Sequence, residues 1–252
     1  MKKLIFIHGN SQSARIWDHI ISSKTLSAYR CIAINLPGHG GNLPKDWNDE
    51  DYTIPKIGQW LENYLFQQQP DEYILVGFSY ASNIIGEALS LPGCKGIVLI
   101  GSSAIGRDAG LEQVLLPNPY GEALMAAEPD PSILNGFIRI QLLIQNEAVF
   151  ALMKEAYLHT HPAVRTNIPK VLMNQGLADE IAAILAFQLP VLAIAGVEEK
   201  NVVPDYLDRT RLVKRLWNGK THLVENAAHA VHVDQPKIFL ELLSEFASAV
   251  FK

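Results

Sequence analysis

Short apolar runs along this chain alternate with longer segments of helical period. Five runs lack polar alternation, which is typical of strands buried on both faces; they cover residues 4–8, 31–35, 73–77, 96–101 and 191–196, and a weaker sixth covers 220–225. The stretches between them are amphipathic, as in 54–65, where Ile57, Leu61 and Leu65 share one helical face. This order predicts an α/β fold with a mostly parallel central sheet flanked by helices.

One segment breaks the alternation. Between about 107 and 188 no convincing strand is found, and the stretches 133–158 and 168–189 have helical character interrupted by prolines. We therefore expect residues 1–102 and 189–252 to form the core and residues 103–188 to form a helical insertion.

Composition narrows the class of protein. Apolar residues make up 48% of the 252 residues, and the net charge of −5, without a basic stripe, argues against a nucleic-acid partner. No window approaches the roughly 18 apolar residues of a membrane span, and the apolar run 4–7 is too short for a signal peptide. A cytoplasmic protein with two reduced thiols, Cys31 and Cys94, is expected.

A candidate nucleophile lies at the junction of the third strand and the following helix. Residues 77–81, Gly-Phe-Ser-Tyr-Ala, match the pattern G-x-S-x-G except at Ala81. In this pattern the strand turns sharply into the helix with the serine at the apex, and small residues on both sides let the two backbones approach. Ser79 is thus a candidate nucleophile; the alternative is a serine that caps the helix.

Two loops offer partners for Ser79. After the first strand, the backbone N–H of Asn10 is placed to form an oxyanion hole with the N–H of Tyr80, while His8 is expected only to hold its loop. His229 follows the last strand, at the carboxyl edge of the sheet where sites collect. An acid in the loop 197–204, either Glu199 or Glu198, is expected to fix the imidazole tautomer.

The remaining histidines do not indicate a metal. His229, His232 and Asp234 lie close in sequence, but no further ligand completes a recognised zinc spacing. We expect neither a metal nor another cofactor.

Taken in order, these motifs resemble those of the α/β-hydrolase superfamily over almost the whole chain. The matching stretches are "HGN", "NLPGHGG", "GFSYA", "AGVEEKNVVP" and "AAHAVHVDQP". The resemblance implies Ser79 as nucleophile, His229 as general base, Glu199 as acid with Glu198 open, and 103–188 as a helical cap. The chain departs from the usual motifs at Asn35, Ala81, Ala228 and Asp234, and Pro204 comes one residue late.

The implied activity is hydrolysis of a small, apolar carboxylic ester, thioester or lactone through an acyl-enzyme. Carbon–carbon bond hydrolases and aminopeptidases of this fold stay open, as does a lyase similar to one of menaquinone synthesis, although residues 80–91 lack the arginine of that lyase. A non-catalytic small-molecule receptor is the alternative of another class. Arg139 and Arg165 are expected to be solvated, with binding of an anionic tail as their alternative; the oligomeric state is not predicted.

Overall fold

The computed structural model describes residues 2–68, 72–174 and 176–251, and within them it contains one six-stranded sheet. Every strand pair is parallel, and the strand order is β2-β1-β3-β4-β5-β6. The strands are β1 (Lys3–Ile7), β2 (Arg30–Ile34), β3 (Tyr73–Phe78), β4 (Cys94–Ile100), β5 (Val191–Gly196) and β6 (His222–Val224). All six predicted strands are confirmed, and so is the parallel α/β class.

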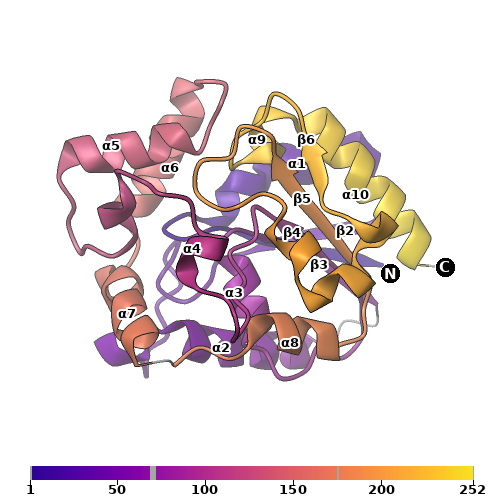
Figure 1. The fold of residues 1–252 in the computed structure, drawn as a ribbon, viewed down its shortest axis with the longest axis horizontal. Coiled ribbons are helices and arrows are strands. Elements are labelled where there is room, and N and C mark those ends of the chain that lie inside the picture. Colours follow the sequence, from indigo (N-terminus) through magenta and orange to yellow (C-terminus); the bar gives the residue numbers. More distant parts are fainter. Residues whose placement is uncertain (1, 69–71, 175, 252) are drawn as a thin grey trace.

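Helices cover both faces of this sheet (Figure 1). Helices α1 and α10 lie on one side, and helices α2, α3 and α8 lie on the other. The α-helices are α1 (Asp18–Ile21), α2 (Ile54–Gln68), α3 (Ala81–Gly86), α4 (Leu111–Val114), α5 (Pro131–Ile140), α6 (Glu147–Leu158), α7 (Pro162–Met173), α8 (Glu180–Ala186), α9 (Val231–Asp234) and α10 (Pro236–Val250).

Alternation along each strand divides the apolar core into two layers. In β1, Leu4 and Phe6 pack with Phe239 of α10, whereas Ile5 and Ile7 pack in a second cluster with α2 and α3. The central strands β3 and β5 are buried along their whole length, as the apolar runs predict. The prediction of full burial is wrong for β2, which is partly exposed because it lies at the edge of the sheet.

The segment between β4 and β5, residues 103–188, contains helices α4 to α8. Each predicted helical stretch holds two helices rather than one, because a capping side chain begins a second helix within it. Asn146 caps α6 and Asp179 caps α8. Position 175, in the second stretch, lies outside the described residues. Figure 1 shows α5, α6 and α7 grouped beside the sheet, whereas α8 packs against α3. The boundaries at 102/103 and 188/189 stay a prediction.

Within the described residues, no helix is both long and apolar enough to cross a membrane. The two cysteines, Cys31 and Cys94, are free thiols.

The close approach of α2 to α3 depends on Gly58. A Cβ atom at Gly58 would lie 2.5 Å from Glu87 Cβ and 3.1 Å from the carbonyl oxygen of Ile84. A glycine-to-alanine change inside a helix usually stabilises by roughly 1 kcal/mol, but here the methyl group has no room. We predict that Gly58→Ala lowers the free energy of unfolding by about 1–3 kcal/mol in urea denaturation.

Gly121 provides the matched control, because a Cβ there would meet nothing within 4 Å. Gly121→Ala is expected to change stability by less than about 0.5 kcal/mol. A Gly58→Ala protein as stable as the wild type would contradict the packing described for α2 and α3.

Candidate active site

The predicted site residues leave the sheet at its carboxyl edge, from four strands. The loops after β1 and β3 carry Asn10 and Ser79, and these strands are neighbours with Ile7 paired to Gly77. Strands β2 and β3 flank β1 on opposite sides, so the strand order reverses at β1. In open α/β sheets, ligands bind at such a point of reversal. Glu199 and His229 follow the neighbouring strands β5 and β6.

Ser79 occupies the apex of a sharp turn between β3 and α3. Its φ of +52° lies in the left-handed region, which costs a non-glycine residue roughly 1–2 kcal/mol. The Ser79 N–H donates to the carbonyl oxygen of Ile100 at 2.8 Å, which ties the turn to β4. A Cβ at Gly77 would lie only 3.2 Å from Ala81 Cβ, so Gly77 lets the turn close over the extra methyl group of Ala81.

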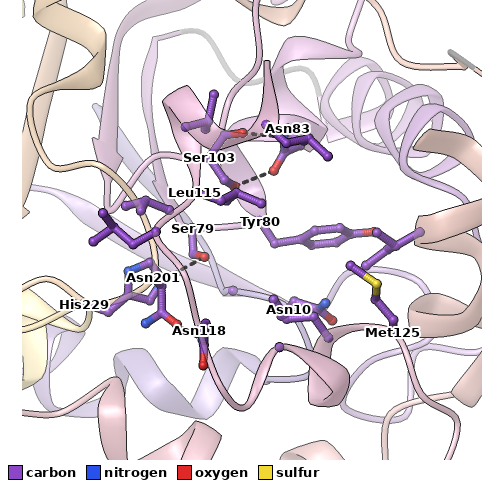
Figure 2. Close-up of a pocket in the computed structure, with 18 of the residues that line it drawn as sticks. Asn10, Ser79, Tyr80, Asn83, Ser103, Leu115, Asn118, Met125, Asn201 and His229 are labelled. Atoms are coloured by element: carbon purple, nitrogen blue, oxygen red, sulfur yellow. Dashed lines mark hydrogen bonds between the residues drawn. The ribbon is translucent and has the colours of Figure 1, made fainter. Parts of the chain in front are cut away.

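Ser79, His229 and Glu199 form one line of hydrogen bonds. Ser79 Oγ lies 2.8 Å from His229 Nε2, and His229 Nδ1 lies 2.7 Å from Glu199 Oε2; Figure 2 shows Ser79 and His229 joined in this way. Gly101, at the end of β4, leaves room for the imidazole, since a Cβ there would lie 2.8 Å from His229 Nδ1.

The carboxylate of Glu199 is buried yet held as an anion. Burial alone would raise its pKa, but the facing His229 and backbone N–H donors outweigh burial and hold the pKa below its ordinary value. The donors are the N–H groups of Lys200 and Asn201, each 2.8 Å from Glu199 Oε1. Glu198 points elsewhere and accepts from the N–H of Ala227 at 3.1 Å. The carboxylate in contact with His229 is therefore that of Glu199.

The two predicted oxyanion donors lie beside Ser79 and are free. Within the described residues, the backbone N–H groups of Asn10 and Tyr80 donate to no protein acceptor, and both residues line the same cavity as Ser79. The Asn10 loop is anchored by a buried imidazole, as predicted for His8: its Nε2 accepts from the N–H of Leu36 at 3.1 Å. Burial lowers the pKa of His8 to about 4, so the ring stays neutral and keeps its acceptor nitrogen.

The cavity in front of Ser79 has a volume of about 330 Å³. Its walls are mainly aliphatic, and they include Ile54, Leu111, Val114, Leu124, Ile168 and Leu172. Polar groups interrupt this lining: Figure 2 shows Asn83 bonded to Ser103 on one wall and Asn118 with Asn201 on the side of His229. Within the described residues, the lining includes one carboxylate, Glu122, and no lysine or arginine. The cavity thus suits a neutral, largely apolar ligand.

Sequence reasoning missed a structural function for Asp234. Its carboxylate accepts the backbone N–H groups of Leu143, Ile144 and Ala228 at 2.9–3.1 Å. Asp234 thereby joins the loop of His229 to the segment 103–188. The only signal in the sequence was its position, where the resembled family usually has glutamate.

His232, which lies close to His229 and Asp234 in sequence, is packed in the core. Its ring is fully buried and stacks on Trp17 at a centroid distance of 4.2 Å. Within the described residues, no group of three or more histidine, cysteine or acidic side chains has the arrangement of a metal site.

The buried carboxyl group of Glu180 binds two residues of the cavity wall. Glu180 Oε2 accepts from Asn83 Nδ2 at 2.8 Å and from the N–H of Ile105 at 2.7 Å. Burial raises the pKa of Glu180 to about 8; the carboxylates of Glu87 and Asp179 add to the rise, and the two hydrogen bonds oppose it. Glu180 therefore carries a proton at neutral pH.

Comparisons with known proteins relate the whole chain to one family. A model of the alpha/beta hydrolase family matches residues 4–242. The esterase Rv0045c of Mycobacterium tuberculosis is 24% identical over 96% of this chain and 81% of its own length. A pimeloyl-acyl-carrier-protein methyl ester esterase of Yersinia pseudotuberculosis is 24% identical over 97% of this chain and 92% of its own.

A solved structure shares the fold. The N-acyl homoserine lactonase AidH, complexed with N-butanoyl homoserine, superposes with a TM-score of 0.85 at 22% identity, over 98% of this chain and 88% of that one.

The titration of Glu180 predicts a dependence of stability on pH. The folded-state pKa of about 8 lies above the unfolded value near 4.5, so the unfolded chain releases the proton first and stability falls as pH rises between these values. Glu180→Gln keeps an acceptor for Asn83 and Ile105 and cannot ionise. We predict that from pH 5 to pH 8.5 the wild type loses more unfolding free energy than the variant, by an amount on the order of a few kcal/mol.

Urea denaturation across this pH range measures the difference. If the unfolding free energies of the two proteins change with pH in parallel, Glu180 ionises with an ordinary pKa.

Proposed function

Because the chain belongs to the alpha/beta hydrolase family, we propose that it cleaves a small, apolar carboxylic ester with Ser79, His229 and Glu199 as its catalytic triad. The chain is a hydrolase of the carboxylic-ester type. The observation that carries the proposal is the continuous line of hydrogen bonds from Ser79 Oγ through His229 to Glu199, at 2.8 and 2.7 Å.

Each residue has a defined part in the proposed mechanism. His229 Nε2 takes the hydroxyl proton as Ser79 Oγ attacks the ester carbonyl carbon, and Glu199 stabilises the imidazolium that forms. The N–H groups of Asn10 and Tyr80 receive the negative charge that develops on the carbonyl oxygen. His229 then protonates the leaving alcohol. Water activated by the same imidazole hydrolyses the acyl-enzyme.

The cavity supports a small neutral substrate. Its volume of about 330 Å³ and its aliphatic walls suit a short acyl chain or an aryl group. Thioesters and lactones undergo the same attack at a carbonyl carbon and belong to the same proposal. We further propose that residues 103–188 act as a cap, since Val114, Leu124 and Ile168 from this segment line the cavity. A cytoplasmic location also stays part of the proposal.

Other activities of this fold have less support. Within the described residues the cavity lining has no lysine or arginine to hold the carboxylate of a lyase substrate. A peptidase needs acidic side chains to bind the amine of its substrate, and Glu122 is the one carboxylate among the described lining residues. Of the other acidic residues between β4 and β5, Glu147, Glu155 and Asp179 pair with arginines and Glu180 is buried. A receptor without turnover remains the contrasting hypothesis, and the next experiment distinguishes it.

A fluorophosphonate probe tests the nucleophile. We expect the probe to add covalently to Ser79, detected as a mass shift on its peptide, and we expect multiple turnovers of p-nitrophenyl acetate. Ser79→Ala should abolish labelling and lower kcat by a factor on the order of 10⁶, as found when a serine hydrolase loses its nucleophile. A single slow turnover would favour the receptor, and absence of labelling would refute the nucleophile.

The adjacent glutamates form a matched pair for testing the acid. Glu199→Gln removes the charge that stabilises the imidazolium, so we expect kcat to fall by a factor on the order of 10²–10⁴. Glu198→Gln keeps an oxygen for the N–H of Ala227 and should leave kcat within about threefold of the wild type. Equal effects of the two changes in steady-state kinetics would exclude Glu199 as the acid.

A further inference from the structure

Arg165 of α7 is a buried cation without an anionic partner. Only 2% of its surface is exposed, and within the described residues no carboxylate lies within 4 Å of its guanidinium. The prediction that Arg165 is solvated is therefore wrong, and it does not line the cavity as a binding group for an anionic tail. A charge buried in this way costs several kcal/mol unless other groups satisfy it.

The guanidinium is satisfied by neutral oxygens and one ring. Nε and Nη2 donate to the carbonyl oxygens of Ala126 and Ala127 at 2.9 and 2.7 Å. Nη1 donates to Ser11 Oγ at 3.2 Å and to the carbonyl oxygen of Tyr157 at 3.4 Å. The guanidinium carbon also lies 4.1 Å from the centre of the Tyr157 ring, at cation–π distance.

Ser11 connects this cation to the loop that carries Asn10. The Ser11 backbone is left-handed, with φ of +54°, and so needs contacts to hold it. Its hydroxyl accepts from Arg165 and donates to Asn10 Oδ1 at 3.0 Å. Its N–H donates to His39 Nε2 at 3.2 Å, and burial together with the neighbouring His8 holds the pKa of His39 well below its ordinary value, which leaves that nitrogen an acceptor.

The same arginine also fixes a wall of the cavity. Ala126 directly follows Met125, which faces the cavity opposite Ser79 in Figure 2. One and two turns further along α7, Ile168 and Leu172 line the cavity as well. Arg165 is thus bonded both to the loop of the oxyanion donor and to the segment that closes over it.

From these contacts we propose that Arg165 is a positioning residue, which holds the N–H of Asn10 in place for the oxyanion through Ser11. This inference rests on the proposed function, because it assigns Arg165 a part in the same reaction. Arg165 touches neither the substrate nor the reacting atoms. Its contribution is to restrict the Asn10 loop to one arrangement when the segment 103–188 is packed against it.

The test measures kcat and KM for p-nitrophenyl acetate in Arg165→Met, Arg165→Lys, Ser11→Ala and the double variant Arg165→Met/Ser11→Ala. Loss of one oxyanion donor lowers kcat by roughly 10²–10³, which sets the upper limit for losing its support. We expect kcat to fall about 10–100-fold in Arg165→Met and in Ser11→Ala, with KM within about threefold and with partial recovery in Arg165→Lys. Because both changes break one line of contacts, the double variant should be no slower than Arg165→Met alone.

Arg139→Met is the matched control. Arg139 also belongs to the segment 103–188 and stacks on an aromatic ring, Phe150, but its side chain is 45% exposed and pairs with Glu147 at the surface. This variant should keep the wild-type kcat.

Three results would overturn the inference. They are an unchanged kcat in Ser11→Ala, a fall in kcat of the double variant equal to the product of the two single falls, or a higher KM as the sole effect of Arg165→Met. If Arg165→Met does not fold, Ser11→Ala decides alone, since it leaves the contacts of Arg165 with Ala126 and Ala127 in place. Failure of the proposed function is distinguishable, because the wild type would then show no hydrolysis that depends on Ser79.

Discussion

The hydrogen bond between Ser79 Oγ and His229 Nε2 joins positions 150 residues apart, and the arrangement of the site depends on it. Strand β4 and strand β5 lie between the strands that precede these two residues, so the loop after β6 must reach across their ends. Gly101 makes this crossing possible at the end of β4, where any side chain would occupy the space of the imidazole. The left-handed turn at Ser79 raises the hydroxyl to meet the ring.

Two neutral imidazoles and one charged carboxylate support the loops around the hydrogen bond between Ser79 and His229. His8 and His39 are fully buried and each accepts one backbone N–H, which a protonated ring nitrogen would be unable to do. Glu199 is buried to a similar degree but remains an anion, because His229 and two backbone N–H groups face it. The charge states thus follow from which partners each buried group meets, rather than from burial alone.

Much of the architecture was predictable from the sequence, because each strand is a short apolar run and each run belongs to one sheet. The positions of Ser79 and His229 at the carboxyl edge of the sheet were predictable from local motifs that follow particular strands. The choice between Glu199 and Glu198 was not, since adjacent side chains in an irregular loop point in different directions and only the loop geometry selects one. Arg165 was misjudged because a charged side chain normally indicates exposure, whereas its burial is compensated by backbone carbonyl groups distant in sequence. The burial of Glu180, which accepts the N–H of Ile105, was not predicted. Nothing local in the sequence records such partners.

Two of the attachments between residues 103–188 and the rest of the chain restrict how this segment can diversify. Arg165 of this segment donates to Ser11 Oγ, and the N–H groups of Leu143 and Ile144 donate to the Asp234 carboxylate. A segment grafted from another member of the family would arrive without its matching loop. It would leave the Ser11 hydroxyl without its arginine donor and the Asp234 carboxylate with the N–H of Ala228 alone. Divergence of specificity through this region therefore requires coordinated change at Ser11 and Asp234, and the segment is not a freely interchangeable module.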